Sequence, residues 1–153
     1  SSDLRRVVIM NKRRQRWALA FLWMAVIFFL SGQSGSESAS LSTSLFKPLF
    51  DMLIPMGISA DTLSLFIRKT AHFFSYLILG IFIFRALDTY QIELSQKVYM
   101  SILLCVGYAI SDEIHQLFVD GRAGSLMDVM IDSMGSVTSV TYLAMKRKKE
   151  VNV

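Results

Sequence analysis

Four apolar stretches divide the chain, and polar or charged segments separate them. The stretches are Trp17–Leu30, Phe73–Phe84, Val98–Ile110 and Val129–Met145. Each is shorter than the roughly 20 residues that a spanning helix needs, so a soluble helical bundle is the alternative. Weakly polar neighbours extend each stretch towards that length, however, and none has the polar face of a surface helix. The pattern therefore predicts an all-α integral membrane bundle with four transmembrane helices, at about 16–32, 70–87, 96–112 and 127–145.

Composition supports the membrane class. Hydrophobic residues make up 53% of the chain and charged residues only 18%, whereas soluble chains carry about 25% charge. The single cysteine, Cys105, lies inside an apolar stretch. It excludes an intrachain disulfide and a cysteine-based metal site, and we interpret it as a small buried hydrophobe.

The segment between the first two spans changes from polar to amphipathic. Ser31–Ser44 is rich in serine and glycine and predicts an outer loop. Apolar residues then recur at helical spacing, which predicts Leu41–Ile54 as a short outer helix, either interfacial or re-entrant. Ser59 or Asp61 can cap the next helix, which we expect to run to about Leu87.

Basic residues predict the orientation. With four spans and the N-terminus inside, the inner segments are 1–16, 85–97 and 146–153. They contain 12 of the 16 lysines and arginines, and cytoplasmic segments carry such an excess. We therefore expect a multi-pass protein with both termini cytoplasmic. The net charge of +4 reflects this topology, with membrane lipids as partners and no nucleic acid.

The N-terminal residues differ from the rest of the chain. The chain begins Ser-Ser-Asp-Leu, and the later run that starts at Met10 is typical of a natural start. We therefore expect residues 1–9 to be a fusion or vector remnant and 10–153 to be a single membrane domain.

Four polar motifs lie at the edges of the apolar stretches, and the predicted topology places all of them on the outer side. They are Arg68-Lys69-x2-His72-x3-Tyr76, Ser111-Asp112-Glu113-x-His115-Gln116, Gly121-Arg122-x-Gly124-Ser125 and Asp128-x3-Asp132. Ionisable groups beside hydrocarbon are costly and are usually functional. Helical spacing also aligns Asp128 and Asp132 with Gly135 and Ser139, and the small half of this stripe would allow close approach by another helix.

One interpretation of these motifs is a site for lipid-linked phosphate or ester chemistry. Its candidate catalytic residues are His72, Glu113 and Asp128, since His and a desolvated Glu can titrate near neutrality. Its candidate substrate-binding residues are Lys69, Tyr76, Gln116, Arg122, Ser125 and Asp132. We expect His72, Glu113, Arg122 and Asp128 to converge on one cavity, with Arg122 either paired to a carboxylate or gripping a phosphate.

Two other interpretations stay open. In the first, Arg122 and Lys69 neutralise carboxylates so that the helix ends can be buried, and the cluster is structural. In the second, His72, Glu113 and Asp128, with His115 as a further ligand, hold a metal. Glu113 and His115 are two residues apart and point away from each other on a helix. We therefore assign no metal ligand and expect no cofactor.

The motifs together resemble those of the VanZ family of small bacterial membrane proteins. The matching runs are Lys69-x2-His72-x3-Tyr76, Asp112-Glu113-x2-Gln116, Gly121-Arg122-x2-Ser125-x2-Asp128 with Gly135, and Leu30-Ser31-Gly32-Gln33-Ser34. The resemblance extends from about Trp17 to Met145. It implies a multi-helix protein of the bacterial cell membrane, linked through the founding member to teicoplanin resistance, and no agreed reaction. The family commonly has Asn at the position of Asp132, so this chain departs by one potential charge.

The leading hypothesis is a protein that acts on the cell envelope at the outer leaflet. It would bind a lipid-linked cell-wall precursor or a surface polymer, with modification by a hydrolase or transferase activity left open. The alternative is a non-enzymatic interaction or scaffold protein whose polar cluster is structural. A small transporter is less favoured, because no charge is placed at mid-membrane.

Overall fold

The computed structural model describes residues 2–151, with side chains for residues 5–150. Within this part the chain forms six helices and no strand, as expected for an all-α protein. They are α1 (Ser2–Ser31), α2 (Gly35–Leu45), α3 (Lys47–Leu53), α4 (Ala60–Leu87), α5 (Leu94–Gln116) and α6 (Leu126–Val151). Residues 1 and 152–153, parts of the predicted remnant and the predicted membrane domain, lie outside the described residues.

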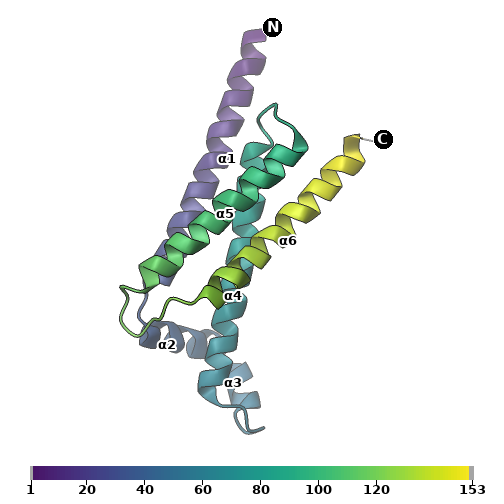
Figure 1. Ribbon diagram of the computed structural model, residues 1–153. Helices are drawn as coiled ribbons and strands as arrows, with labels where there is room; N and C mark the ends of the chain where they lie inside the picture. Colours follow the sequence, from purple (N-terminus) through teal and green to yellow (C-terminus); the bar gives the residue numbers. More distant parts are fainter. Residues whose placement is uncertain (1, 152–153) are drawn as a thin grey trace.

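Helix α4 is the central element, and it packs against α1, α2, α5 and α6. Both ends of the chain and the α4–α5 turn lie at one end of the bundle (Figure 1), which we call the termini end. Helix α2, the end of α5 and the loop between α5 and α6 lie at the opposite end, called the α2 end. The predicted polar motifs are therefore gathered at the α2 end.

The start of α4 follows from its sequence. Ser59 is the N-cap, and its hydroxyl accepts the backbone N–H of Thr62 at 3.2 Å. This satisfies one of the unpaired donors at the helix start. The helix continues to Leu87, as expected. The core around it contains Ala20, Ile27, Tyr76, Leu79, Ile83, Leu87, Cys105 and Ala109.

Small residues set the close contact between α4 and α6. A Cβ added at Gly135 would collide with the backbone carbonyl of Phe73, and one added at Gly80 would collide with the Ser139 hydroxyl. The two helices thus approach where side chains are absent or small. The expected close approach along the Gly135 and Ser139 stripe is confirmed.

The segment between α1 and α4 differs from the prediction. The loop expected at Ser31–Ser44 is mostly helix α2, and the single helix expected at Leu41–Ile54 is divided between α2 and α3. The cause of the early start is a capping box, in which Ser34 and Glu37 each accept a hydrogen bond from the other's backbone N–H. Pro48 lies in the first turn of α3, a position that needs no N–H. Prediction from serine and glycine content was therefore wrong here.

Two helices, α4 and α5, are individually long and apolar enough to span a membrane. A third candidate span arises if α1 and α2, which are bent by 105° relative to each other, count as one broken or re-entrant span. Helix α6 begins at Leu126 as expected but does not meet the same criterion within the described residues. The described residues thus contain two or three candidate spans, where the sequence predicts four.

Candidate functional site

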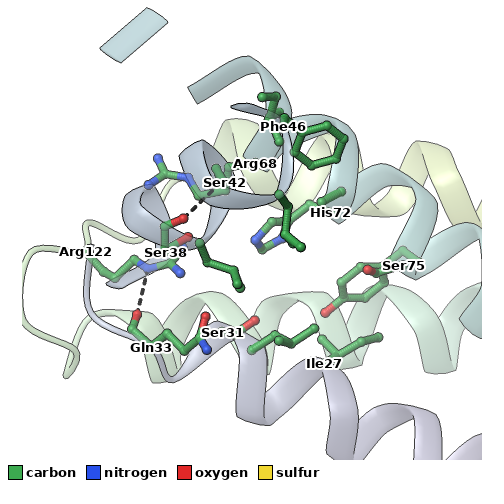
Figure 2. A pocket seen from close by; sticks show the side chains of 16 residues that line it. Ile27, Ser31, Gln33, Ser38, Ser42, Phe46, Arg68, His72, Ser75 and Arg122 are labelled. Atoms are coloured by element: carbon green, nitrogen blue, oxygen red, sulfur yellow. Dashed lines mark hydrogen bonds between the residues drawn. The ribbon is translucent and has the colours of Figure 1, made fainter. Parts of the chain in front are cut away.

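A pocket of about 280 Å³ lies between α1, α2 and α4 at the α2 end. Figure 2 shows side chains from these helices and from the α5–α6 loop converging on it. Much of the lining is apolar, including Ile27, Leu41 and Phe46. Its ionisable side chains are those of Arg68, His72, Tyr76 and Arg122. The pocket therefore combines an apolar wall with cationic groups.

The loop after α5 places Arg122 at this pocket. Gly121 has a φ of +70°, a conformation that favours glycine, and the adjacent carbonyl of Asp120 accepts the N–H of Gly35 at 3.1 Å. The loop thus packs on the start of α2. Arg122 Nε then donates to the carbonyl of Gln33 at 3.1 Å (Figure 2).

Neither arginine of the pocket is neutralised by a carboxylate. Within residues 5–150, Arg68 and Arg122 form no ion pair. Burial lowers the pKa of the Arg122 guanidinium from its ordinary value, and the charge of Arg68 acts in the same direction. Arginine nevertheless stays protonated near neutrality. The pocket thus holds two positive charges that a bound anion could neutralise.

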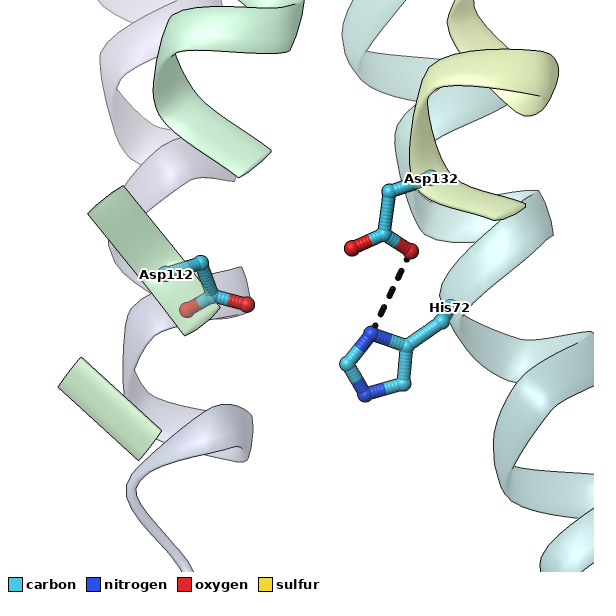
Figure 3. A group of neighbouring side chains, drawn as sticks. All are labelled: His72, Asp112 and Asp132. Carbon is cyan, nitrogen blue, oxygen red and sulfur yellow. Dashed lines mark ion pairs between the residues drawn. The ribbon is translucent and has the colours of Figure 1, made fainter. Parts of the chain in front are cut away.

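A second cluster adjoins the pocket and comes from three helices. His72 on α4, Asp112 on α5 and Asp132 on α6 face one another in Figure 3. His72 Nδ1 lies 3.3 Å from Asp132 Oδ1, and Ser31 Oγ donates to Asp112 Oδ2 at 2.8 Å. Both aspartates are almost fully buried. The cluster therefore concentrates two carboxyl groups and an imidazole away from water.

Several atoms of this cluster have no hydrogen-bond partner among the described residues. They are both carboxylate oxygens of Asp132, Oδ1 of Asp112 and the hydroxyl of Tyr76. Buried polar atoms are almost always paired. These atoms are therefore available to a ligand, an ion or a proton.

The other predicted site residues bind one another. Lys69 forms an ion pair with Asp128 between α4 and α6. Glu113 Oε2 accepts the backbone N–H of Ser125 at 2.8 Å, and Glu113 Oε1 accepts from Gln116 Nε2 at 3.2 Å. These contacts fasten the start of α6 to α4 and α5. None of the five residues lines the pocket.

Fewer of the predicted residues meet at the pocket than expected. Of the four residues expected at one cavity, His72 and Arg122 line the pocket, whereas Glu113 and Asp128 do not. Arg122 pairs with neither carboxylate. Asp128 pairs with Lys69 instead, and Glu113 accepts hydrogen bonds from the Ser125 backbone and from Gln116.

At two positions the geometry favours the residue next to the one that the sequence predicts. Asp112 joins His72 where Glu113 was expected, and Arg68 reaches the pocket where Lys69 was expected. Helical phase gave no signal that separates Asp112 from Glu113, since both lie within about one turn of Gln116. His115 lies apart from the cluster and stacks on Phe28 with ring centroids 4.1 Å apart.

The fold and the site define a multi-pass helical membrane protein with a buried polar cluster at one end of its bundle. Residues 16–147 match the family model described as VanZ/LLP1. The chain therefore belongs to the VanZ/LLP1 family, which confirms the resemblance seen in its motifs. Teicoplanin resistance is connected to it by family association alone. The chain has no significant match among curated proteins or among solved structures.

Proposed function

We propose that this protein binds an anionic, lipid-linked component of the bacterial cell envelope in the pocket between α1, α2 and α4. The observation that carries the proposal is the pair of arginines, Arg68 and Arg122, whose charges no described carboxylate neutralises. A guanidinium can hold two phosphate oxygens at once, and partial burial strengthens that contact. A phosphate-bearing head group therefore fits this pocket.

The surroundings of the arginines support a ligand with a hydrocarbon tail. A second pocket of about 320 Å³ lies between α3 and α4 and shares Phe46, Ile67 and Ala71 with the first. Its lining includes Leu49, Phe66 and Phe74. A head group at the arginines could thus continue into an apolar chain along the shared wall. A free anion without a hydrocarbon tail would not occupy this second, apolar pocket.

Charge distribution supports an outer-leaflet position for the pocket. The two ends of the chain and the α4–α5 turn share the termini end (Figure 1), and these segments carry 12 of the 16 basic residues. The positive-inside rule then favours both termini in the cytoplasm. The pocket, at the α2 end, would face outwards.

This orientation requires four crossings, with α1 and α6 as the additional spans. Three polar side chains of α6 support this assignment because they are buried: Asp132 and Ser136 fully, and Ser139 almost fully. Its exposed side chains include Met130, Met134 and Tyr142, which suit a lipid-facing surface. An average over the whole helix therefore understates how apolar its outer face is.

Modification of the bound component would involve His72, the pocket-lining group best suited to proton transfer. The contacts of Lys69, Glu113 and Asp128 support a structural role for these residues. If the whole cluster is structural, the second candidate function is a non-enzymatic scaffold. A changed surface component would reduce engagement by lipid-anchored glycopeptides, which would connect this member to the resistance associated with its family.

The experiment is a comparison of bound lipids by native mass spectrometry. The purified protein is given equal amounts of phosphatidic acid and phosphatidylcholine with identical acyl chains. We expect phosphatidic acid to be retained preferentially, and Arg122→Lys to reduce this preference by about tenfold because an ammonium lacks the two-point geometry. Arg14→Lys, an exposed position near the termini end, is the matched control. Equal retention of both lipids by the wild type would support the scaffold function instead.

A further inference from the structure

We infer that His72, Asp112 and Asp132 form a binding site for one divalent transition-metal ion. One candidate ligand atom from each residue lies within 4.8 Å of the others. The three residues come from three helices, α4, α5 and α6 (Figure 3). The inference stands apart from the binding of lipid by Arg68 and Arg122, because neither arginine is among the three ligands and metal binding has its own readout.

The distance between His72 and Asp132 fits a shared ion. At 3.3 Å from Nδ1 to Oδ1, the contact is long for a charge-assisted hydrogen bond. Two ligands that are each about 2.1 Å from a tetrahedral zinc ion are separated by about 3.4 Å. All three ligand atoms lie within 4.8 Å of one another, so Asp112 completes the set after a small rotation of its carboxylate.

The two buried aspartates supply oxygens that a cation could use as ligands. Asp132 is fully buried and Asp112 is 1% exposed, yet three of their four carboxylate oxygens have no hydrogen-bond partner among the described residues. Burial of an unpaired carboxylate is strongly unfavourable. A single divalent cation would neutralise both groups and use the free oxygens as ligands.

Neighbouring residues hold Asp112 in a suitable orientation. Ser31 Oγ donates to its Oδ2 at 2.8 Å, and Gln116 Nε2 lies 3.5 Å from the same oxygen. Oδ1 is thereby left to face the cluster. Ligating carboxylates are commonly oriented in this way by a second hydrogen bond.

The ligand types select the class of ion. An imidazole nitrogen with two carboxylates suits Zn²⁺ or Mn²⁺, whereas Mg²⁺ and Ca²⁺ prefer oxygen ligands alone. Three protein ligands leave a coordination position open, as in non-structural zinc sites. His72 also lines the pocket, so the ion would lie beside whatever the pocket holds.

The test uses the purified wild-type protein in detergent, with any affinity tag removed. The protein is stripped with EDTA, titrated with Zn²⁺ against a chromophoric chelator, and analysed for metal content by mass spectrometry. We expect one Zn²⁺ per chain, with a dissociation constant of about 1 µM or lower, and an increased Tm on binding. If the wild-type protein fails to bind about one equivalent of Zn²⁺ under these conditions, the proposed site is wrong, and no variant is needed to show it.

Variants then assign the ligands. His72→Gln and Asp132→Asn should each weaken Zn²⁺ binding by about tenfold or more. The chain offers matched controls: His115→Gln changes its other histidine, and Asp61→Asn changes an exposed aspartate. Both should bind like the wild type. Equal loss in His115→Gln and His72→Gln would contradict the assignment. Loss of metal binding with phosphate-lipid preference intact would leave the lipid-binding function standing.

Discussion

Lys69 and Asp128 illustrate how the charged residues at the α2 end divide into two groups. This pair is partly buried, with 31% and 18% of the side chains exposed, and each partner neutralises the other. Glu113 is similarly satisfied by the loop backbone and by Gln116. Arg68 and Arg122, by contrast, have no described carboxylate partner. Satisfied groups hold helices together, and unsatisfied groups are available to a ligand.

A double-mutant cycle on Lys69→Met and Asp128→Asn tests whether the paired charged residues hold the helices together. Each single change should lower the free energy of unfolding. The double change should cost less than the sum, with a coupling of about 0.5 to 1 kcal/mol. Thermal unfolding in detergent gives the values. The exposed pair Lys47 and Asp51 is the control and should show a smaller coupling.

The same variants distinguish an organising residue from a binding residue. Lys69→Met should retain the wild-type preference for phosphatidic acid, because Lys69 does not line the pocket. Loss of that preference at unchanged stability would assign Lys69 to ligand binding, as the sequence analysis expected.

Helix α6 has two different faces, one that contacts α4 and one that is exposed. Its inner face carries Asp128 and Asp132 and continues with small residues that contact α4. Its outer face is apolar, with exposed methionines at Met130 and Met134. The close contact that positions Asp132 opposite His72 therefore depends on Gly135, one turn further along.

The element-scale prediction concerns that glycine. Gly135→Ala places a Cβ against the carbonyl of Phe73, which belongs to the backbone and cannot rotate away. We expect it to lower the free energy of unfolding by about 1 to 3 kcal/mol. The control is Gly107→Ala on α5, where a Cβ meets nothing within 4 Å; it should be neutral or slightly stabilising, because alanine favours helix. Thermal unfolding of both variants decides, and equal Tm values would contradict the close contact.

Sequence patterns predicted the positions of helices and caps better than they predicted which residues of different helices meet. The cap at Ser59 and the small stripe ending at Ser139 were readable, since both depend on local spacing. The start of α2 was missed, because serine and glycine content outweighed the capping box of Ser34 and Glu37 that the sequence also contains. The residues that meet His72 could not be predicted. Helical phase gives the face of the helix on which a residue lies, and it does not give which residue of another helix that face contacts.

The arrangement of the whole molecule follows from which segments meet at each end. The basic segments meet at the termini end, and the pocket, the His72 cluster and the Arg122 loop meet at the α2 end (Figure 1). On the positive-inside rule we therefore expect the termini end at the cytoplasmic face and the pocket at the outer leaflet.

Cysteine labelling tests this orientation in intact cells. Cys105 is fully buried, so the native chain should react little with an impermeant maleimide. Ser36→Cys, an exposed position at the start of α2, should be labelled from outside. Lys149→Cys, exposed near the end of α6, should react only after permeabilisation. Labelling of Lys149→Cys in intact cells would overturn both the four-span topology and the outer position of the pocket.

An experimental structure of the protein in a lipid nanodisc that contains phosphatidic acid would show whether the arginine pocket holds a phosphate head group. We expect phosphate density within hydrogen-bonding distance of both Arg68 and Arg122, with the acyl chain passing Phe46 into the second pocket. Phosphate density at another position, or a pocket filled only by acyl chains while both guanidinium groups point away, would contradict it.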